Sequence, residues 1–265
     1  PFNGNANDES GNGNDGVETN IVLTTDRFEE DAAFAFNGIN SHIRIEHSDE
    51  LNLLGDFTIS IWFLDTNPPP TSNNHTLIAK RDDGGMCCSP EVPWHCALNY
   101  QQNGTDYQKP LFAAASGGSY TFSQADFEIF LNEWQHLVLT YSEDTLKMHL
   151  DGSNIHSNHV NPANRGSNSD DMLIGMPNRE EGAEVMEGKI DDIGIWSRAL
   201  TEEEILALYN APAPAPGCTD STACNYNAEA NEDDGSCLST LELSLQNQIQ
   251  ISSEGELVLT APETL

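Results

Sequence analysis

From residue 17 to residue 196 the sequence consists of short apolar runs that Gly, Asn, Asp and Pro separate. In residues 57–64 every second side chain is apolar, as in a strand with one face on a core. The other predicted strands are 33–36, 42–45, 76–80, 96–100, 109–115, 134–141, 146–151, 154–156, 172–176 and 188–196. This spacing predicts an all-β fold, an antiparallel jelly-roll β-sandwich.

One short helix is predicted near the C-terminal end of the sandwich, at residues 201–209. Thr201 is expected to be its N-cap, and Glu204 lies three residues later, as in a capping box. The acidic residues 202–204 would lie in the first turn, where the helix dipole favours negative charge.

Composition changes after this helix predict three further segments. Alternating Ala and Pro at 211–217 predict a stiff linker that ends a sandwich domain at 1–210. Residues 218–238 are rich in Cys, Asn and Asp and too short for a hydrophobic core, which predicts a small module held by disulfides or a cation. Residues 239–265 alternate again and predict a β-hairpin or the start of another domain.

The net charge limits the classes of partner. The chain has 43 Asp and Glu residues against 10 Lys and Arg residues, a net charge of −33. Such a charge repels phosphate backbones and anionic lipids, so we predict no nucleic-acid partner. No run approaches the ~20 apolar residues of a membrane span, so no membrane insertion is predicted.

The cysteines fall into two groups of three, and none is in a Cys-x-x-Cys pattern. An even total without zinc-type spacing favours disulfides and an oxidising, extracellular compartment. The odd groups leave two alternatives open: one bridge joins the groups, or each group keeps a free thiol. Within the first group we expect a bridge from Cys87 or Cys88 to Cys96. The second group is Cys218, Cys224 and Cys237.

Several motifs together resemble a known family. They are the opening segment 2–16, Phe36-Asn-Gly38, residues 57–62, Trp134-Gln-His-Leu137, Asp151-Gly152 and residues 188–200. This combination resembles the laminin-G-like branch of the concanavalin A-like lectin/glucanase superfamily. Residues 218–237 are similar to a short, thrombospondin type 3-like repeat of large secreted surface proteins from marine Bacteroidetes-type bacteria. The resemblance implies a sandwich that binds Ca²⁺ and recognises glycans or proteins without catalysis.

The opening loop is the first predicted calcium site. Calcium takes six to eight oxygen ligands from carboxylates, amides and carbonyls of tightly turning loops. The resemblance places this loop beside residues 191 and 192, so the predicted ligands are Asp8, Asn12, Asn14, Asp15, Asp191 and Asp192. The alternative is an ordinary Asx/Gly turn that satisfies its own backbone.

A second possible calcium site lies in the small module, although its spacing does not match an EF-hand. The candidate ligands are Asp220, Asn225, Asn227, Asp233 and Asp234. The alternative is a solvated acidic turn held by disulfides.

Aromatic residues in or beside the long loops are candidates for ligand binding, since aromatic rings stack on the C–H faces of sugars. They are Trp62, Trp94, Tyr100, Tyr107 and Tyr120. Trp62 alternates away from Ile59 and Ile61, which places it on a sheet face that we expect to be exposed. For Trp94 the alternative is packing against a disulfide.

Catalytic patterns are weak. Neighbouring residues of a strand point to opposite faces, so Asp191 and Asp192 are not expected to share a site as a glycosidase pair would. No Gly-x-Ser-x-Gly elbow occurs. His136 and His149 are interpreted as paired surface imidazoles.

We therefore predict a noncatalytic, calcium-binding recognition domain of a secreted or cell-surface protein, binding carbohydrate or a surface protein in adhesion. The chain lacks an initiating Met and a leader, so it is expected to be processed or part of a longer polypeptide. One alternative is a structural spacer or filament protomer that self-associates through residues 239–265. A polysaccharide hydrolase is the third alternative.

Overall fold

The computed structural model describes residues 2, 4–66, 74–81, 91–99, 109–116, 119–161, 165–177, 184–233, 235–238, 249–251 and 257–259. The contacts within the chain divide it into two compact units, Pro1–Ala211 and Pro212–Leu265.

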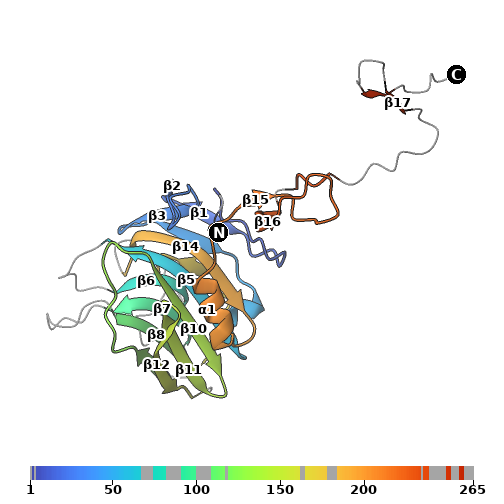
Figure 1. Ribbon diagram of the computed structural model, residues 1–265. Coiled ribbons are helices and arrows are strands. Elements are labelled where there is room, and N and C mark those ends of the chain that lie inside the picture. The colour runs from blue at the N-terminus through green and yellow to red at the C-terminus, as the bar shows by residue number, and fades with distance from the viewer. Residues whose placement is uncertain are drawn as a thin grey trace. The chain divides into compact units, whose positions relative to one another are not determined.

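The first unit is a sandwich of two seven-stranded antiparallel sheets (Figure 1). Sheet A has the order β1 (Gly16–Thr19), β4 (His42–Ile45), β13 (Met172–Ile174), β6 (His75–Lys80), β7 (Glu91–Asn99), β8 (Lys109–Ser116) and β9 (Ser119–Gln124). Sheet B has the order β12 (Ser153–His159), β11 (Thr145–Leu150), β10 (Gln135–Ser142), β5 (Phe57–Asp65), β14 (Glu187–Trp196), β3 (Ala33–Asn37) and β2 (Val22–Thr24). The predicted all-β sandwich is confirmed.

The core lies between the sheets and follows from the alternation that the sequence shows. On β5 the alternating residues Phe57, Ile59, Ile61 and Phe63 are at most 1% exposed and belong to one apolar cluster with side chains of both sheets. β5 lies between β10 and β14 at the centre of sheet B. Burial of these side chains is the main stabilising contribution of the fold.

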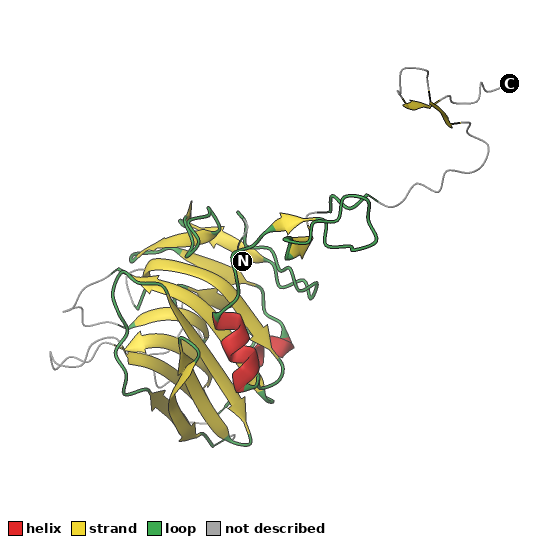
Figure 2. Ribbon diagram, in the orientation of Figure 1, coloured by secondary structure: helices red, strands yellow, loops and turns green. Residues whose placement is uncertain are grey.

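The described residues contain one α-helix, α1 (Glu202–Tyr209), which begins as the sequence predicts. The Thr201 side chain accepts a hydrogen bond from the Glu204 amide, and the Glu204 side chain accepts one from the Thr201 amide. Ile205 is buried against Val138 of β10 and Leu200, so the helix covers the outer face of sheet B (Figure 2). As a result both faces of β5 are buried.

Three strands of the sandwich have no counterpart in the sequence prediction: β1, β2 and β9. β1 and β2 are short and only partly covered, with Val17 52% and Val22 66% exposed. The apolar alternation that marks a half-buried strand is therefore missing from both.

The second unit contains two small pairs of strands. β15 (Pro216–Gly217), within the segment predicted as linker, pairs in parallel with β16 (Glu232–Asp233). β17 (Ile249–Ile251) pairs antiparallel with β18 (Leu257–Leu259).

The cysteine pairing differs in part from the prediction. Cys218 and Cys237 form a disulfide, whereas Cys224 is an exposed free thiol. The expected bridge from Cys96 is wrong: its side chain is a free thiol that points into the core, where burial raises the pKa of the thiol to about 12. Cys87 and Cys88 lie outside the described residues.

Candidate ligand-binding site

The opening loop folds back on itself through its acidic side chains. Asp8 accepts hydrogen bonds from the Ser10 amide (2.8 Å) and the Asn14 amide (2.9 Å), and Asp15 accepts one from the Asp8 amide (2.8 Å). Burial alone would raise the pKa of Asp8, but these hydrogen bonds outweigh it and lower the pKa below its usual value. Asp8 is therefore a firmly ionised group at the centre of the loop.

Gly16 fixes this loop against sheet A. Its amide donates to the Ala6 carbonyl (2.8 Å), which closes the loop at the start of β1. A Cβ atom at Gly16 would lie 2.5 Å from Cγ2 of Ile43 on β4, so only glycine permits this close approach. The loop is thereby held over one edge of the space between the sheets.

A pocket of about 650 Å³ lies beneath the loop. Both sheets contribute aliphatic side chains to its wall: Ile43, Ile45, Met172 and Ile174 from sheet A, and Ile193 and Ile195 from β14. Leu51 and Leu53 add to the apolar part, with Phe2 and Ala6. The polar part comes from Glu50, Ser197 and six residues of the opening loop: Asn7, Asp8, Glu9, Ser10, Asn12 and Asn14. Gly194 and Trp196 complete the lining.

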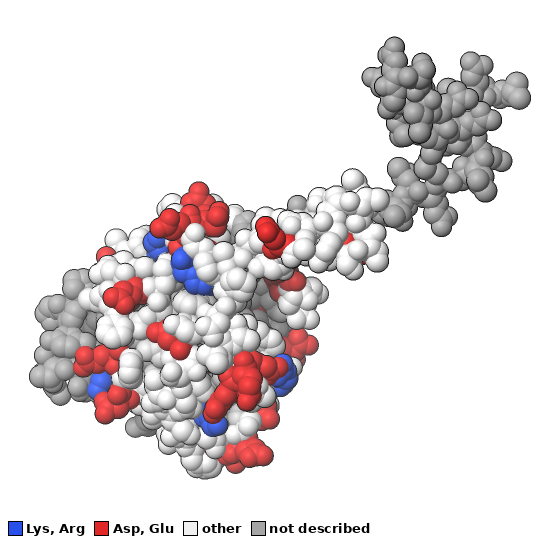
Figure 3. All heavy atoms as spheres, viewed as in Figure 1, with Lys and Arg blue, Asp and Glu red and all other residues white. Residues whose placement is uncertain are grey.

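The pocket carries negative charge. Asp8, Glu9 and Glu50 line it, and none of the described residues that line it is a Lys or Arg. Acidic side chains also outnumber basic ones on the face of the molecule that Figure 3 shows. The pocket thus combines an apolar interior with an acidic margin.

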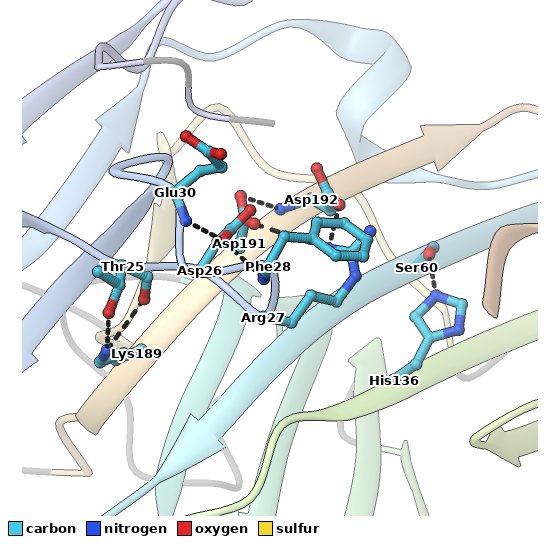
Figure 4. Close-up of polar contacts among 10 residues, drawn as sticks. All are labelled: Thr25, Asp26, Arg27, Phe28, Glu30, Ser60, His136, Lys189, Asp191 and Asp192. Carbon is cyan, nitrogen blue, oxygen red and sulfur yellow. Dashed lines mark hydrogen bonds and ion pairs between the residues drawn. The ribbon is translucent and has the colours of Figure 1, made fainter. Parts of the chain in front are cut away.

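A second polar cluster lies on the outer face of sheet B, around Arg27 (Figure 4). The Arg27 guanidinium lies 2.5 Å from a carboxylate oxygen of Asp192 and 3.7 Å from one of Asp191. It also lies 4.2 Å from the ring centre of Phe28 and 4.3 Å from that of Trp62. Two carboxylates and two aromatic rings therefore surround this cation.

The loop that carries Arg27 is held by its own hydrogen bonds. Asp26 accepts from the amides of Phe28 (2.7 Å) and Glu30 (2.9 Å), and Lys189 of β14 donates to the carbonyl and hydroxyl oxygens of Thr25 (Figure 4). Sequence reasoning did not identify Arg27. The only signal for it in the sequence is that Lys and Arg are scarce, ten in the chain.

The prediction that Asp191 and Asp192 point to opposite faces is wrong. The pairing of β14 with β5 shifts register between Asp191 and Gly194, and Asp192 has a φ of 45°. This bulge turns both carboxylates toward Arg27. Burial and the charge of Asp192 raise the pKa of Asp191 to about 7.

The structure does not bring the first predicted calcium set together. Asp8, Asn12 and Asn14 line the pocket, Asp15 binds the loop's backbone, and Asp191 and Asp192 are paired with Arg27. Among the described residues no group of three or more His, Cys, Asp and Glu side chains is placed to hold a metal ion. The six-residue set therefore does not fit a single calcium ion, since Arg27 already supplies the positive charge beside two of its members.

In the described part of the module the second predicted set accepts backbone hydrogen bonds, three of them in Asx-type turns and one, at Asn225, from a distant residue. Asp220 accepts from the Thr222 amide, Asn225 from the Leu238 amide, and Asn227 from the Glu229 amide. Asp233 accepts from the Gly235 amide, and Asp234 lies outside the described residues.

Two of the predicted ligand-binding aromatics are buried instead. Trp62 is on the outer face of β5 as predicted but only 7% exposed, because it stacks on His136 (4.8 Å between ring centres) and Tyr209 of α1 (5.8 Å). Trp94 is in the core, where its indole N–H donates to the Leu51 carbonyl (2.7 Å). Tyr100, Tyr107 and the side chain of Tyr120 lie outside the described residues.

His136 and His149 are buried rather than surface residues. Nε2 of His136 lies 2.7 Å from the Ser60 hydroxyl (Figure 4), a pairing that a serine nucleophile would need. Burial and the charge of Arg27 lower the pKa of His136 to about 4, and its Nδ1 has no hydrogen-bond partner. A weak base without an orienting carboxylate does not activate a serine.

The chain is similar to several known proteins. Adhesion G-protein coupled receptor V1 of Danio rerio is 21% identical over 182 residues, which are 68% of this chain and only 3% of that receptor. Domain 4 of AbnA, a GH43 extracellular arabinanase from Geobacillus stearothermophilus solved with arabinotriose, superposes with a TM-score of 0.58 and 18% identity. This match covers 79% of this chain and 95% of that one.

Two further binding domains have a similar fold. The binding domain of Paraclostridial Mosquitocidal Protein 1 has a TM-score of 0.60 and 20% identity, covering 77% of this chain and 49% of that one. The receptor-binding domain of botulinum neurotoxin C/D mosaic serotype has a TM-score of 0.57 and 16% identity, covering 76% and 47%. At these sequence identities the similarity shows a shared fold alone.

A laminin-G-type family model matches residues 37–206, which is well over half of the chain and runs from β3 into α1. The chain therefore belongs to the concanavalin A-like lectin/glucanases superfamily.

Proposed function

We propose that the first unit is a noncatalytic recognition domain of an extracellular protein, and that it binds a carbohydrate or a surface protein through the pocket beneath the opening loop. The observation that carries the proposal is the pocket itself: about 650 Å³ is within the usual range of ligand sites, roughly 300–1,000 Å³. Its mainly apolar lining with polar groups at one side is also typical of such sites.

Family membership and the similar structures support recognition as the role. The similar structures include an arabinanase domain in complex with arabinotriose, the binding domain of a mosquitocidal protein and the receptor-binding domain of a botulinum neurotoxin. An adhesion receptor is among the relatives in sequence. An extracellular location agrees with these proteins, and no helix of the described residues has the length and hydropathy needed to cross a membrane.

The absence of catalysis is part of the proposal. The surroundings of the candidate catalytic side chains, Asp191, Asp192 and Ser60, support it. Asp191 and Asp192 lie beside Arg27 and are not among the residues that line the pocket, so they do not supply a glycosidase pair at the proposed binding site. Ser60 faces a histidine whose pKa is about 4. A hydrolysis assay on the polysaccharides that the domain retains tests this part, and turnover above that of a heat-denatured sample would contradict it.

We further propose that any calcium ion is held by the opening loop alone. The loop offers carboxylate and amide oxygens from Asp8, Asn12, Asn14 and Asp15, with Gly11 and Gly13 in left-handed conformations that turn the chain tightly. Asp191 and Asp192 are left out of this site, because both lie beside the positive charge of Arg27. Isothermal titration with Ca²⁺ tests this: Asp15→Asn should weaken binding, whereas Asp192→Asn should not.

The proposed function is tested by applying the full chain to a glycan array and to an array of surface-protein peptides, in Ca²⁺ and in EDTA. Ile195→Phe fills the pocket, and it should abolish retention. Val22→Phe makes the same kind of change at an exposed position of β2 outside the pocket lining and should leave retention intact. Circular dichroism of both variants checks folding. Equal retention by both variants would contradict the pocket as the binding site.

Self-association is a second candidate function, favoured by the pairing of β17 with β18. These strands form a two-stranded sheet, which is only marginally stable alone and gains by pairing with further strands. Light scattering of the full chain and of a variant ending at residue 238 tests it. Assembly of the full chain alone would support a filament protomer, and equal monomer mass would contradict it.

A further inference from the structure

We infer that the occupant of the pocket is a segment of a partner protein that presents a lysine or arginine flanked by apolar side chains. This inference rests on the proposed function and names the class of ligand. Two features of the pocket carry it: the apolar interior and the acidic margin without a basic residue among the described lining side chains.

The interior favours aliphatic groups over sugar hydroxyls. The accessible apolar wall includes Ile193 and Ile195 of β14, which are partly buried, whereas Ile43 and Met172 behind them are at most 2% exposed. None of these side chains donates or accepts hydrogen bonds. Burying sugar hydroxyls there without partners would cost about 1–3 kcal/mol for each group. The methylene stem of a lysine or arginine, and the apolar side chains beside it, lose no hydrogen bonds on entering.

Two polar side chains above the interior, those of Asp8 and Ser10, already accept hydrogen bonds within the loop. Asp8 accepts from the Ser10 and Asn14 amides, and Ser10 Oγ accepts from the Asn12 side chain (2.8 Å). Trp196 offers little stacking surface, because its ring lies against Gly194 and packs with the cluster under α1. The pocket therefore offers a sugar few hydrogen-bonding groups and little aromatic surface for stacking.

The negative charge of the pocket margin favours a positively charged occupant. Glu9 and Glu50 place two exposed carboxylates at the margin, and neither is among the calcium ligands proposed above. The net charge of −33 extends this preference beyond the pocket and favours the approach of a basic partner at low ionic strength. A cationic head group held at the margin and an apolar stem inside match both parts of the pocket.

The probe is an array of short peptides in which Lys, Arg, norleucine or Glu stands at the centre of an apolar frame, read beside the glycan array. We expect retention of the Lys and Arg peptides, at least tenfold weaker retention of the norleucine peptides, and loss in high salt. Glu50→Gln should weaken the Lys peptides about threefold to fivefold. Glu128→Gln, which removes the same charge at an exposed position outside the pocket lining, should have no effect.

Other outcomes overturn the inference in distinguishable ways. Retention of glycans that Ile195→Phe abolishes, without retention of basic peptides, would refute the basic occupant and leave the proposed recognition function intact. Equal retention of the Lys, norleucine and Glu peptides would also refute it. Retention of neither glycans nor peptides would refute both proposals.

Discussion

The two faces of β5 are both buried, but by different means. The inner face presents Phe57, Ile59, Ile61 and Phe63 to the apolar core between the sheets. The outer face presents Thr58, Ser60 and Trp62, which are covered by α1 and by the loop that carries Arg27. Burial of apolar area stabilises the inner face, whereas the outer face depends on hydrogen bonds, ring stacking and one partly buried cation.

This difference shows what a single strand can encode. The inner face needs only apolar side chains of suitable size, because hydrophobic burial has no direction. The outer face needs particular partners from distant parts of the chain, since a buried polar group without a partner costs free energy. The two faces should therefore respond differently to substitution and to pH.

The largest expected effect is on the inner face. Ile61→Ala should lower the free energy of unfolding by about 2–5 kcal/mol, because it leaves a cavity in the core. The matched outer-face variant Ser60→Ala should cost about 1–2 kcal/mol, through the lost partner of His136. Urea unfolding of the two variants measures both values. A smaller loss for Ile61→Ala than for Ser60→Ala would contradict the comparison.

Next in size is the removal of the outer-face cation. Arg27→Met should cost about 2–4 kcal/mol, because it leaves the buried Asp191 and the partly exposed Asp192 side by side without the Arg27 charge. Adding Asp192→Asn to this variant should restore part of the loss. Arg198→Met serves as the control, because Arg198 pairs with Glu204 in solvent and should matter little. Equal losses of unfolding free energy in the two arginine variants would show that the ion pairs of Arg27 contribute no more to stability than a solvent-exposed pair.

The outer face should also make stability depend on pH. Asp191 has a pKa of about 7 in the fold, but its carboxyl ionises near pH 4 in the unfolded chain. The unfolded state therefore releases its proton first, and the contribution of Asp191, complete below pH 4, is lost as pH rises from 4 to 7. His136, with a pKa of about 4, acts oppositely and destabilises the fold as pH falls from about 6.5 to 4.

Asp191→Asn isolates the first of these contributions. The stability of the variant relative to the natural sequence should rise by roughly 3 kcal/mol between pH 4 and pH 7. Urea unfolding at several pH values in this window gives the difference directly. A difference that stays constant with pH would mean that Asp191 is ionised throughout. The inner-face variant Ile61→Ala should show such a constant difference.

The smallest expected effect concerns the helix that covers the outer face. Thr201→Ala removes the N-cap of α1 and should cost about 1 kcal/mol. Hydrogen exchange should increase in residues 202–206 first, because the cap holds the first turn. Unchanged exchange there would mean that packing of Ile205 alone keeps the helix in place.

The sequence predicted those parts of the structure that depend on local pattern. The alternation in residues 57–64 gives the inner face of β5, and Thr201 with Glu204 gives the start of α1, because both signals lie within a few residues of one another. The short, partly exposed strands β1 and β2 lack such a pattern.

The candidate site could be predicted only in part. The opening loop was recognised from its Asn, Asp and Gly residues, and Asp8, Asn12 and Asn14 do line the pocket. The role of Asp191 and Asp192 was missed, since it depends on a bulge in β14 and on Arg27, some 165 residues away in sequence. The alternation places Trp62 on the correct face of its strand. Its burial could not be predicted, because Tyr209 and Arg27, which cover its ring, come from two distant segments of the chain.

The central claim, that the pocket beneath the opening loop is the recognition site, is tested most directly by hydrogen exchange of the full chain with and without the tightest-bound array ligand. Our account predicts protection in residues 6–16 and 193–197, which border the pocket from the loop and from β14. Protection confined to other segments, with these two unchanged, would contradict it.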